Sequence, residues 1–101
     1  MFVQLVQSRL KDPNAHDVFL ALTQDMLAWL RVQAGFVAYE LYEGDGYFFD
    51  RLVWEDESSC RAAADRFMET GTAFSMLALV QPEIHTLFGE EIVVAAAQPV
   101  A

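Results

Sequence analysis

An Asp-Gly pair between two runs of β-branched and aromatic residues is the feature that most constrains this chain. Residues 35–55 read GFVAYELYEGDGYFFDRLVWE, with Glu43-Gly44-Asp45-Gly46 between the two runs. A tight hairpin turn needs positive φ at its central residues, and glycine adopts positive φ at little cost. The sequence therefore predicts an antiparallel hairpin with strands at Phe36–Glu43 and Tyr47–Glu55.

Both faces of this predicted hairpin carry apolar side chains, whereas a hairpin with one wet face alternates apolar and polar residues. In the second strand one face holds Phe48, Leu52 and Trp54, and the other holds Tyr47, Phe49 and Val53. Both faces should therefore be covered. Helices can cover one face, and we expect a second copy of the chain on the other.

The chain is apolar enough to support that expectation. The chain has 101 residues, 54% of them hydrophobic. This length predicts a single domain over 1–101, and residues 98–101 are expected to form a frayed tail. One small globule does not easily hide this much apolar material, so the composition indicates self-association.

Charge and cysteine content limit the other partners. Fifteen acidic residues against six basic ones give a formal net charge of −9, a field that repels nucleic acid and anionic membranes. The apolar runs are far shorter than the about 20 residues that span a bilayer. Cys60 is the one cysteine, which excludes an intramolecular disulfide and fits a reducing cytoplasm.

The first half of the chain predicts a strand and a helix before the hairpin. Apolar residues place the strand at Phe2–Leu10, with Ser8 on the same face as Phe2. A 3.6-residue apolar period predicts a helix over Ala15–Ala34. Asn14 is expected to be its N-cap, and Gly35 its C′ glycine.

The second half predicts a broken helix and a last strand. The helix starts near Asp56 as N-cap, is interrupted at Thr70-Gly71-Thr72 and continues over Ala73–Val80. Pro82–Gly89 is expected to form one more helical turn, and Glu90–Ala97 the last strand. The order β-α-β-β-α-β predicts an α+β, ferredoxin-like fold, a four-stranded antiparallel sheet with two helices on one face.

The chain resembles the dimeric α/β-barrel superfamily, and within it the antibiotic biosynthesis monooxygenase-like domains. Three features carry the resemblance: this order of elements, the Gly35-Phe36 pair that opens the second strand, and the Trp-Glu-Asp-Glu-Ser segment at 54–58. The resemblance implies a homodimer in which two sheets face each other as a barrel. It also implies a ligand pocket between sheet and helices. Some such relatives oxidise polycyclic aromatics or quinols without metal or flavin, so no cofactor is expected.

The sequence differs from these relatives at two sets of positions, and the differences reduce the range of activities that we expect. Ser8, Arg61 and Gly71 stand where the haem-degrading branch has Asn, Trp and His, so haem degradation is not expected. Many other relatives carry histidines early in the second helix and near its break, and this chain has none at 61–65 or 71–74.

Seven residues are candidates for the site. His85 and Ser8 are the candidate catalytic residues, since an imidazole can act as a general acid or base and Ser8 stands where relatives place an inward polar group. The candidate substrate-binding residues are Trp54, Tyr39, Phe67, Phe74 and Met76. Two histidines with no cysteine or carboxylate at ligand spacing predict no metal site.

Two functions remain open at this point. The first is a cofactor-independent monooxygenase acting on a small aromatic, quinol-like molecule. The alternative is a non-catalytic dimeric module that binds a small apolar ligand or serves only assembly. A cavity filled by Phe67, Phe74 and Met76 would favour the module, and an open cavity that holds a bound molecule would favour the enzyme.

Overall fold

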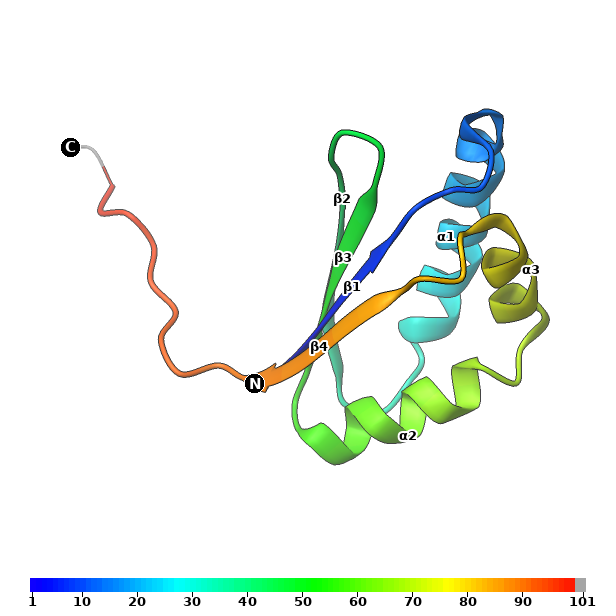
Figure 1. Ribbon diagram of the computed structural model, residues 1–101. Coiled ribbons are helices and arrows are strands. Elements are labelled where there is room, and N and C mark those ends of the chain that lie inside the picture. The colour runs from blue at the N-terminus through cyan, green and yellow to red at the C-terminus, as the bar shows by residue number, and fades with distance from the viewer. Residues whose placement is uncertain (100–101) are drawn as a thin grey trace.

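The computed structural model describes residues 1–99 and has one antiparallel sheet with its helices on one side (Figure 1). The elements in chain order are β1 (Phe2–Ser8), the 3-10 helix η1 (Pro13–Ala15), α1 (His16–Leu30), β2 (Phe36–Glu43), β3 (Phe48–Trp54), α2 (Glu57–Phe67), α3 (Gly71–Leu79) and β4 (His85–Glu90). The four strands lie in the order β2-β3-β1-β4. This confirms the α+β, ferredoxin-like fold.

The hairpin forms where the Asp-Gly turn predicts it. Gly46 has φ +81°, and the Gly44 N–H donates to the Tyr47 carbonyl at 2.8 Å. The second strand is one residue shorter at each end than predicted. A bulge between Phe36 and Ala38 shifts the register, so that Phe36 and Tyr39 both pack against the core on the helix side.

β1 ends two residues earlier than predicted because its backbone changes partner. Beyond Ser8 the chain leaves β3 and meets the segment that precedes β4, with an isolated bridge between Leu10 and Val80. The Gln81 N–H donates to the Arg9 carbonyl at 2.8 Å. This contact closes the end of the sheet near the start of β4.

The predicted N-cap of the first helix is wrong. Asp12, not Asn14, caps this region: its side chain accepts from the Asn14 N–H at 2.9 Å and starts η1. The residue before α1 is Ala15, whose side chain makes no capping bond.

The predicted end of that helix, at Ala34, is also wrong, because the chain tightens into i→i+3 bonds after Leu30. The Gln33 N–H donates to the Leu30 carbonyl at 2.9 Å. Gly35 therefore does not act as a C′ glycine. It has φ +80°, a side chain there would collide with Ser59, and its carbonyl accepts from the Glu55 N–H at 2.8 Å.

The second helix starts as predicted and breaks slightly earlier. The Asp56 side chain accepts from the Ser59 N–H at 2.8 Å, as an N-cap does. The helix stops at Phe67. Thr70 then caps α3, accepting from the Ala73 N–H at 3.1 Å, so the second half begins at Gly71.

The last strand begins five residues earlier and ends seven residues earlier than predicted, at His85–Glu90, and the helical turn at Pro82–Gly89 does not form. β4 pairs with β1 from Gln7–His85 to Phe2–Glu90. The short connection after Val80 brings His85 directly to the end of β1, so the pairing of β4 with β1 runs from there to Phe2. Residues 91–99 leave the sheet without regular structure. Of the predicted frayed tail, residues 100–101 lie outside the described part.

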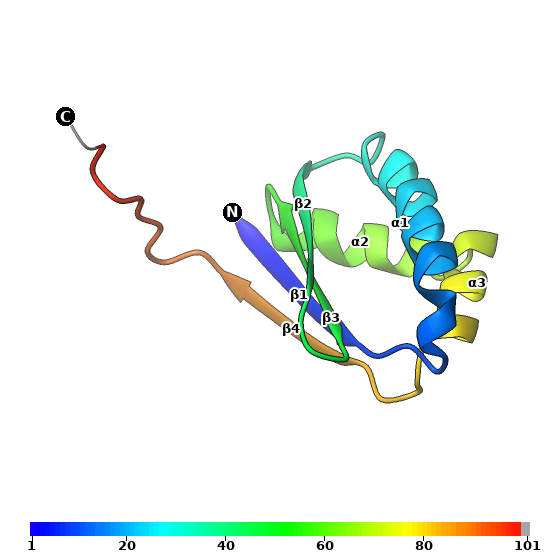
Figure 2. The same ribbon diagram turned by 90° about the horizontal axis from the view of Figure 1, so that it is seen from above.

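α1, α2 and α3 cover one face of the sheet, and within residues 1–99 no helix covers the other face (Figures 1 and 2). The main core lies between sheet and helices and contains Phe2, Met26, Leu30, Leu52, Trp54, Cys60 and Ala63. We call the uncovered side the open face. Paired strand positions place on it Leu5, Gln7, Glu40, Tyr42, Phe49, Arg51, His85 and Leu87. None of the helices in the described residues is long and apolar enough to cross a bilayer.

Candidate functional site

A cavity of about 330 Å³ lies between the sheet and the helices. Its wall is mostly apolar and comes from all three α-helices and from β1, β3 and β4. The apolar lining includes Val6, Phe19, Met26, Trp29, Leu30, Leu52, Phe67, Met68, Met76, Leu77, Val80 and Ile84. Both tryptophans of the chain, Trp29 and Trp54, lie in this wall.

Small side chains on the helices leave this space open. Ala63 and Ala64 on α2 and Ala73 on α3 all line the cavity. Ala63 and Ala73 are fully buried, so the helices approach the sheet closely at these points. A longer side chain at Ala64 would occupy the cavity.

Few polar groups reach the cavity. They come from Gln4, Ser8, Asp50, Trp54 and Thr86. Gln4 already has a partner, because its Oε1 accepts from the Cys60 Sγ at 3.7 Å. Burial raises the pKa of the Cys60 thiol, which keeps this cysteine protonated and unreactive at neutral pH.

Asp50 is the one carboxylate in the lining. The Tyr39 hydroxyl donates to its Oδ2 at 3.0 Å, whereas its Oδ1 is buried with no hydrogen-bond partner. Burial raises the pKa of Asp50 to about 6, and the hydrogen bond from Tyr39 opposes this shift. Burial likewise raises the pKa of Tyr39, so Tyr39 remains a neutral donor.

The indole of Trp54 belongs to the wall of the same cavity. Its side chain is among the most completely buried of the described residues, and the Phe36 ring packs edge-on against it at 5.6 Å. Its Nε1–H has no partner. Asp50 and Trp54 lie four residues apart on one face of β3, so their Cα atoms are roughly 13 Å apart along the strand.

The structure brings most of the predicted site residues together. Ser8, Trp54, Phe67 and Met76 line the cavity, and Tyr39 reaches it through Asp50. Two candidates lie elsewhere. Phe74 points outward with 77% of its surface exposed. His85 pairs with Gln7 on the open face and lines a separate shallow groove with Leu5, Tyr47, Phe49 and Leu87.

Asp50 is the residue that the sequence analysis missed. A signal was present, because Asp50 alternates with Phe48 and Leu52 and so falls on their inward face. Burying a single carboxylate among apolar residues costs free energy unless it is paired and hydrogen-bonded, so an acid at such a position indicates a functional role.

Among residues 1–99, no cluster of three or more His, Cys, Asp or Glu side chains has the spacing that would hold a metal ion. The polar groups in the cavity wall are the carboxyl of Asp50, the indole N–H of Trp54, the hydroxyls of Ser8 and Thr86 and the amide of Gln4. Together they can bind and orient a flat molecule with polar edges.

No protein-family model and no curated protein sequence matches the chain. Solved structures do match it over nearly its whole length. A mutant of SnoaB, a cofactor-independent oxygenase from Streptomyces nogalater, has a TM-score of 0.77 at 17% identity, covering 92% of this chain and 94% of that one.

Two further structures agree with this match. A monooxygenase from the gene ActVA-Orf6 of Streptomyces coelicolor, in complex with nanaomycin D, has a TM-score of 0.75 at 20% identity, covering 96% of this chain and 92% of that one. An antibiotic biosynthesis monooxygenase has a TM-score of 0.69 at 21% identity, covering 92% of this chain and 100% of that one. The chain therefore has the fold of the antibiotic biosynthesis monooxygenase domain proteins, as its sequence resemblance predicted.

Proposed function

We propose that this protein is a cofactor-independent monooxygenase that oxidises a small, electron-rich, quinol-like aromatic molecule in the cavity between sheet and helices. The observation that carries the proposal is the Asp50 carboxylate in the wall of an apolar cavity, with its Oδ1 buried and without a hydrogen-bond partner. The likeness in fold to oxygenases supports it.

The proposed chemistry needs a base, because a phenolate gives electrons to oxygen far more readily than a phenol. Asp50 accepts the phenolic proton at Oδ1, while Tyr39 holds Oδ2 in place. A pKa of about 6 leaves Asp50 ionised at neutral pH and closer to a phenol's pKa than an ordinary aspartate is. Trp54 donates its N–H to an oxygen at the far edge of the ring system.

The overall reaction balances without an external reductant. A hydroquinone and O₂ give a hydroxyquinone and water: one oxygen atom enters the ring, the other leaves as water, and the substrate supplies the electrons. The aromatic and methionine side chains of the wall pack on the ring faces and exclude water. Ser8 is a further donor at this site, whereas His85 and Phe74 have no part in the proposal.

The test is oxygen uptake with a panel of substituted hydroquinones and naphthohydroquinones. Asp50→Asn keeps the shape of the side chain but removes the base, so turnover is expected to fall about 100-fold or more. His85→Gln is the matched control, since its side chain lies on the other side of the sheet, and it should retain wild-type turnover.

Two results would contradict the proposal. Full turnover in Asp50→Asn would remove the proposed base. Tight binding of the panel with no oxygen uptake would favour the alternative, a non-catalytic module that holds a small apolar ligand.

A further inference from the structure

The cavity between sheet and helices reaches the surface along the seam between the helices α2 and α3 and the edge strand β4. Among the described residues of its wall, the exposed ones are Met68, Leu77 and Thr86. Met68 follows α2, Leu77 lies on α3 and Thr86 lies on β4. We call the opening between these three residues the mouth.

The base of the proposed chemistry lies across the sheet from the mouth. Val6 on β1 pairs with Asp50 of β3 on one side and with Thr86 of β4 on the other. Two strand spacings, about 10 Å, therefore separate the backbone at Asp50 from the mouth. A ring that meets Asp50 with one edge turns its opposite edge toward the mouth, so a substituent on that edge can leave the cavity there.

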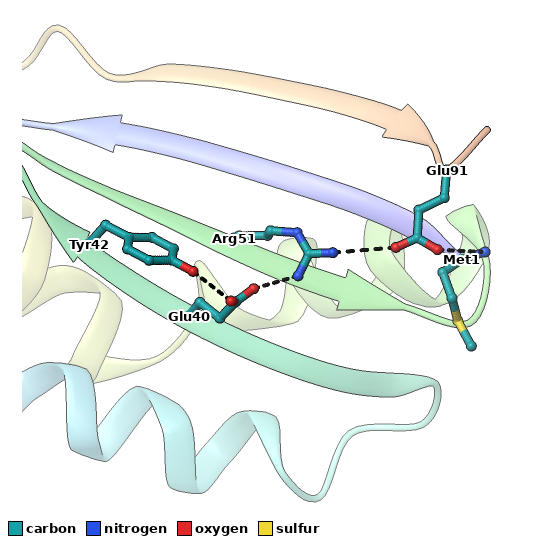
Figure 3. Close-up of polar contacts among 5 residues, drawn as sticks. All are labelled: Met1, Glu40, Tyr42, Arg51 and Glu91. Atoms are coloured by element: carbon teal, nitrogen blue, oxygen red, sulfur yellow. Dashed lines mark hydrogen bonds and ion pairs between the residues drawn. The ribbon is translucent and has the colours of Figure 1, made fainter. Parts of the chain in front are cut away.

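The sheet itself is the closed side of the cavity, and polar contacts on the open face hold its strands together. Arg51 on β3 contacts Glu40 on β2 and, at 3.4 Å, Glu91 just after β4 (Figure 3). The Tyr42 hydroxyl donates to Glu40 at 2.6 Å. A substituent too long for the cavity therefore leaves through the mouth and not through the sheet.

A contact between α2 and β4 closes one end of the seam. The guanidinium of Arg61 lies 3.9 Å from the centre of the Phe88 ring, an attractive cation–π arrangement, and the Glu57 carboxylate accepts from the same guanidinium at 3.2 Å. From this contact α2 runs toward Met68, and β4 leads back toward Thr86. A substituent that leaves the mouth is therefore directed away from Arg61 and toward α3.

Outside the mouth, α3 continues the apolar wall of the cavity onto the surface. Phe74 is 77% exposed and lies three residues before Leu77, so the two side chains are neighbours on the helix surface. We call Met68, Phe74 and Leu77 the track. Single exposed apolar residues are ordinary, but a cluster that extends a pocket marks a binding surface. The three side chains offer no N–H or O–H donor, so the track suits a hydrocarbon chain.

We propose that the substrate is a hydroquinone that carries an alkyl chain, with its ring in the cavity and its chain on the track. This inference rests on the proposed function, because it takes the position of the ring from Asp50. The track binds the chain equally in the ground state and in the transition state. It should therefore lower KM for alkylated substrates and leave kcat unchanged.

The test measures quenching of tryptophan fluorescence by methylnaphthoquinone and by its ethyl, butyl and hexyl derivatives. In the wild type Kd should fall about twofold for each added methylene, half the effect of full burial on a logarithmic scale. Phe74→Ser should remove most of this gain and leave Kd for methylnaphthoquinone unchanged. Val32→Ser is the matched control, since Val32 is 80% exposed in the connection after α1, and it should keep the full gain.

Leu77→Ser is a second variant of the track and should also reduce the gain, with circular dichroism to verify that it folds. Equal Kd values for the methyl and hexyl quinones in the wild type would overturn the inference. So would a gain that both Phe74→Ser and Leu77→Ser retain. Neither result bears on the proposed oxidation, because the quinones are bound and not turned over. Absence of quenching by methylnaphthoquinone would instead contradict the proposed function, and this inference with it.

Discussion

Burial of Asp50 lowers the stability of the folded state, and the same carboxylate is the base in the proposed function. Its pKa rises from 3.8 to about 6 on folding, which means that the folded state holds the proton more tightly than the unfolded state does. Well below pH 3.8 both states are protonated and Asp50 has no effect on stability. As the pH rises from 3.8 to about 6 the unfolded state loses this proton before the folded state does, so stability falls over that interval and the loss is complete at higher pH.

We therefore expect Asp50→Asn to stabilise the protein at pH 8 and to have little effect at pH 4. A shift from 3.8 to about 6 corresponds to a gain of about 3 kcal/mol at the higher pH. Urea unfolding at the two pH values, followed by tryptophan fluorescence, measures this difference. Equal effects of Asp50→Asn on the free energy of unfolding at pH 4 and pH 8 would contradict a raised pKa of Asp50 in the folded state.

On the scale of elements, α2 and α3 set the size of the cavity through their alanines. Ala64→Leu adds apolar volume to the cavity wall, whereas Ala62→Leu makes the same change on the exposed side of α2. Filling the cavity should raise the free energy of unfolding by about 1 kcal/mol, and it should block ligands.

The measurement uses the two tryptophans, which both line the cavity. A naphthoquinone that enters should quench the fluorescence of the wild type and of Ala62→Leu, but not that of Ala64→Leu. If Ala64→Leu is quenched as strongly as the wild type, the quinone binds somewhere other than the cavity.

The elements that could be predicted are those fixed by local chemistry. The hairpin follows from the glycine turn at Gly46, and the start of α2 follows from the Asp56 cap. The position of β4 does not follow from local chemistry. Residues 90–97 have the better strand pattern, but the bridge between Leu10 and Val80 decides which residues reach β1, and that contact joins segments distant in sequence.

The site was partly predictable for the same reason. Ser8 and Trp54 fall on the inward face of strands whose alternation is readable, so their place in the cavity follows from register. His85 was a candidate catalytic residue that the sequence placed in a helical turn before the last strand. Once β4 begins at His85, its pairing with Gln7 turns the imidazole to the open face.

On the scale of the whole molecule, one exposed contact ties the start of α1 to the end of the hairpin. The Nε2 atom of His16 lies 3.0 Å from a carboxylate oxygen of Glu43, and Asp17 lies 3.5 Å from the other ring nitrogen. The hydrogen bond to Glu43 is the main cause that raises the pKa of His16. The charged imidazole therefore favours the folded state.

A raised histidine pKa gives a stabilisation that is complete below the unfolded value of 6.5 and is lost as the pH rises through the folded value. We expect stability to fall as the pH rises above 6.5, and His16→Gln to flatten this part of the curve. Urea unfolding across this range is the measurement, and an identical slope in His16→Gln would contradict the assignment.

Strand β3 places neighbouring residues in two separate environments. Asp50 points into the cavity, and Arg51, the next residue, anchors the ion pairs of the open face. A single peptide unit thus separates the carboxylate in the cavity wall from the ion pairs of the open face. A substitution at Arg51 therefore acts on the open face and one at Asp50 acts on the cavity, although the two residues are adjacent in the sequence.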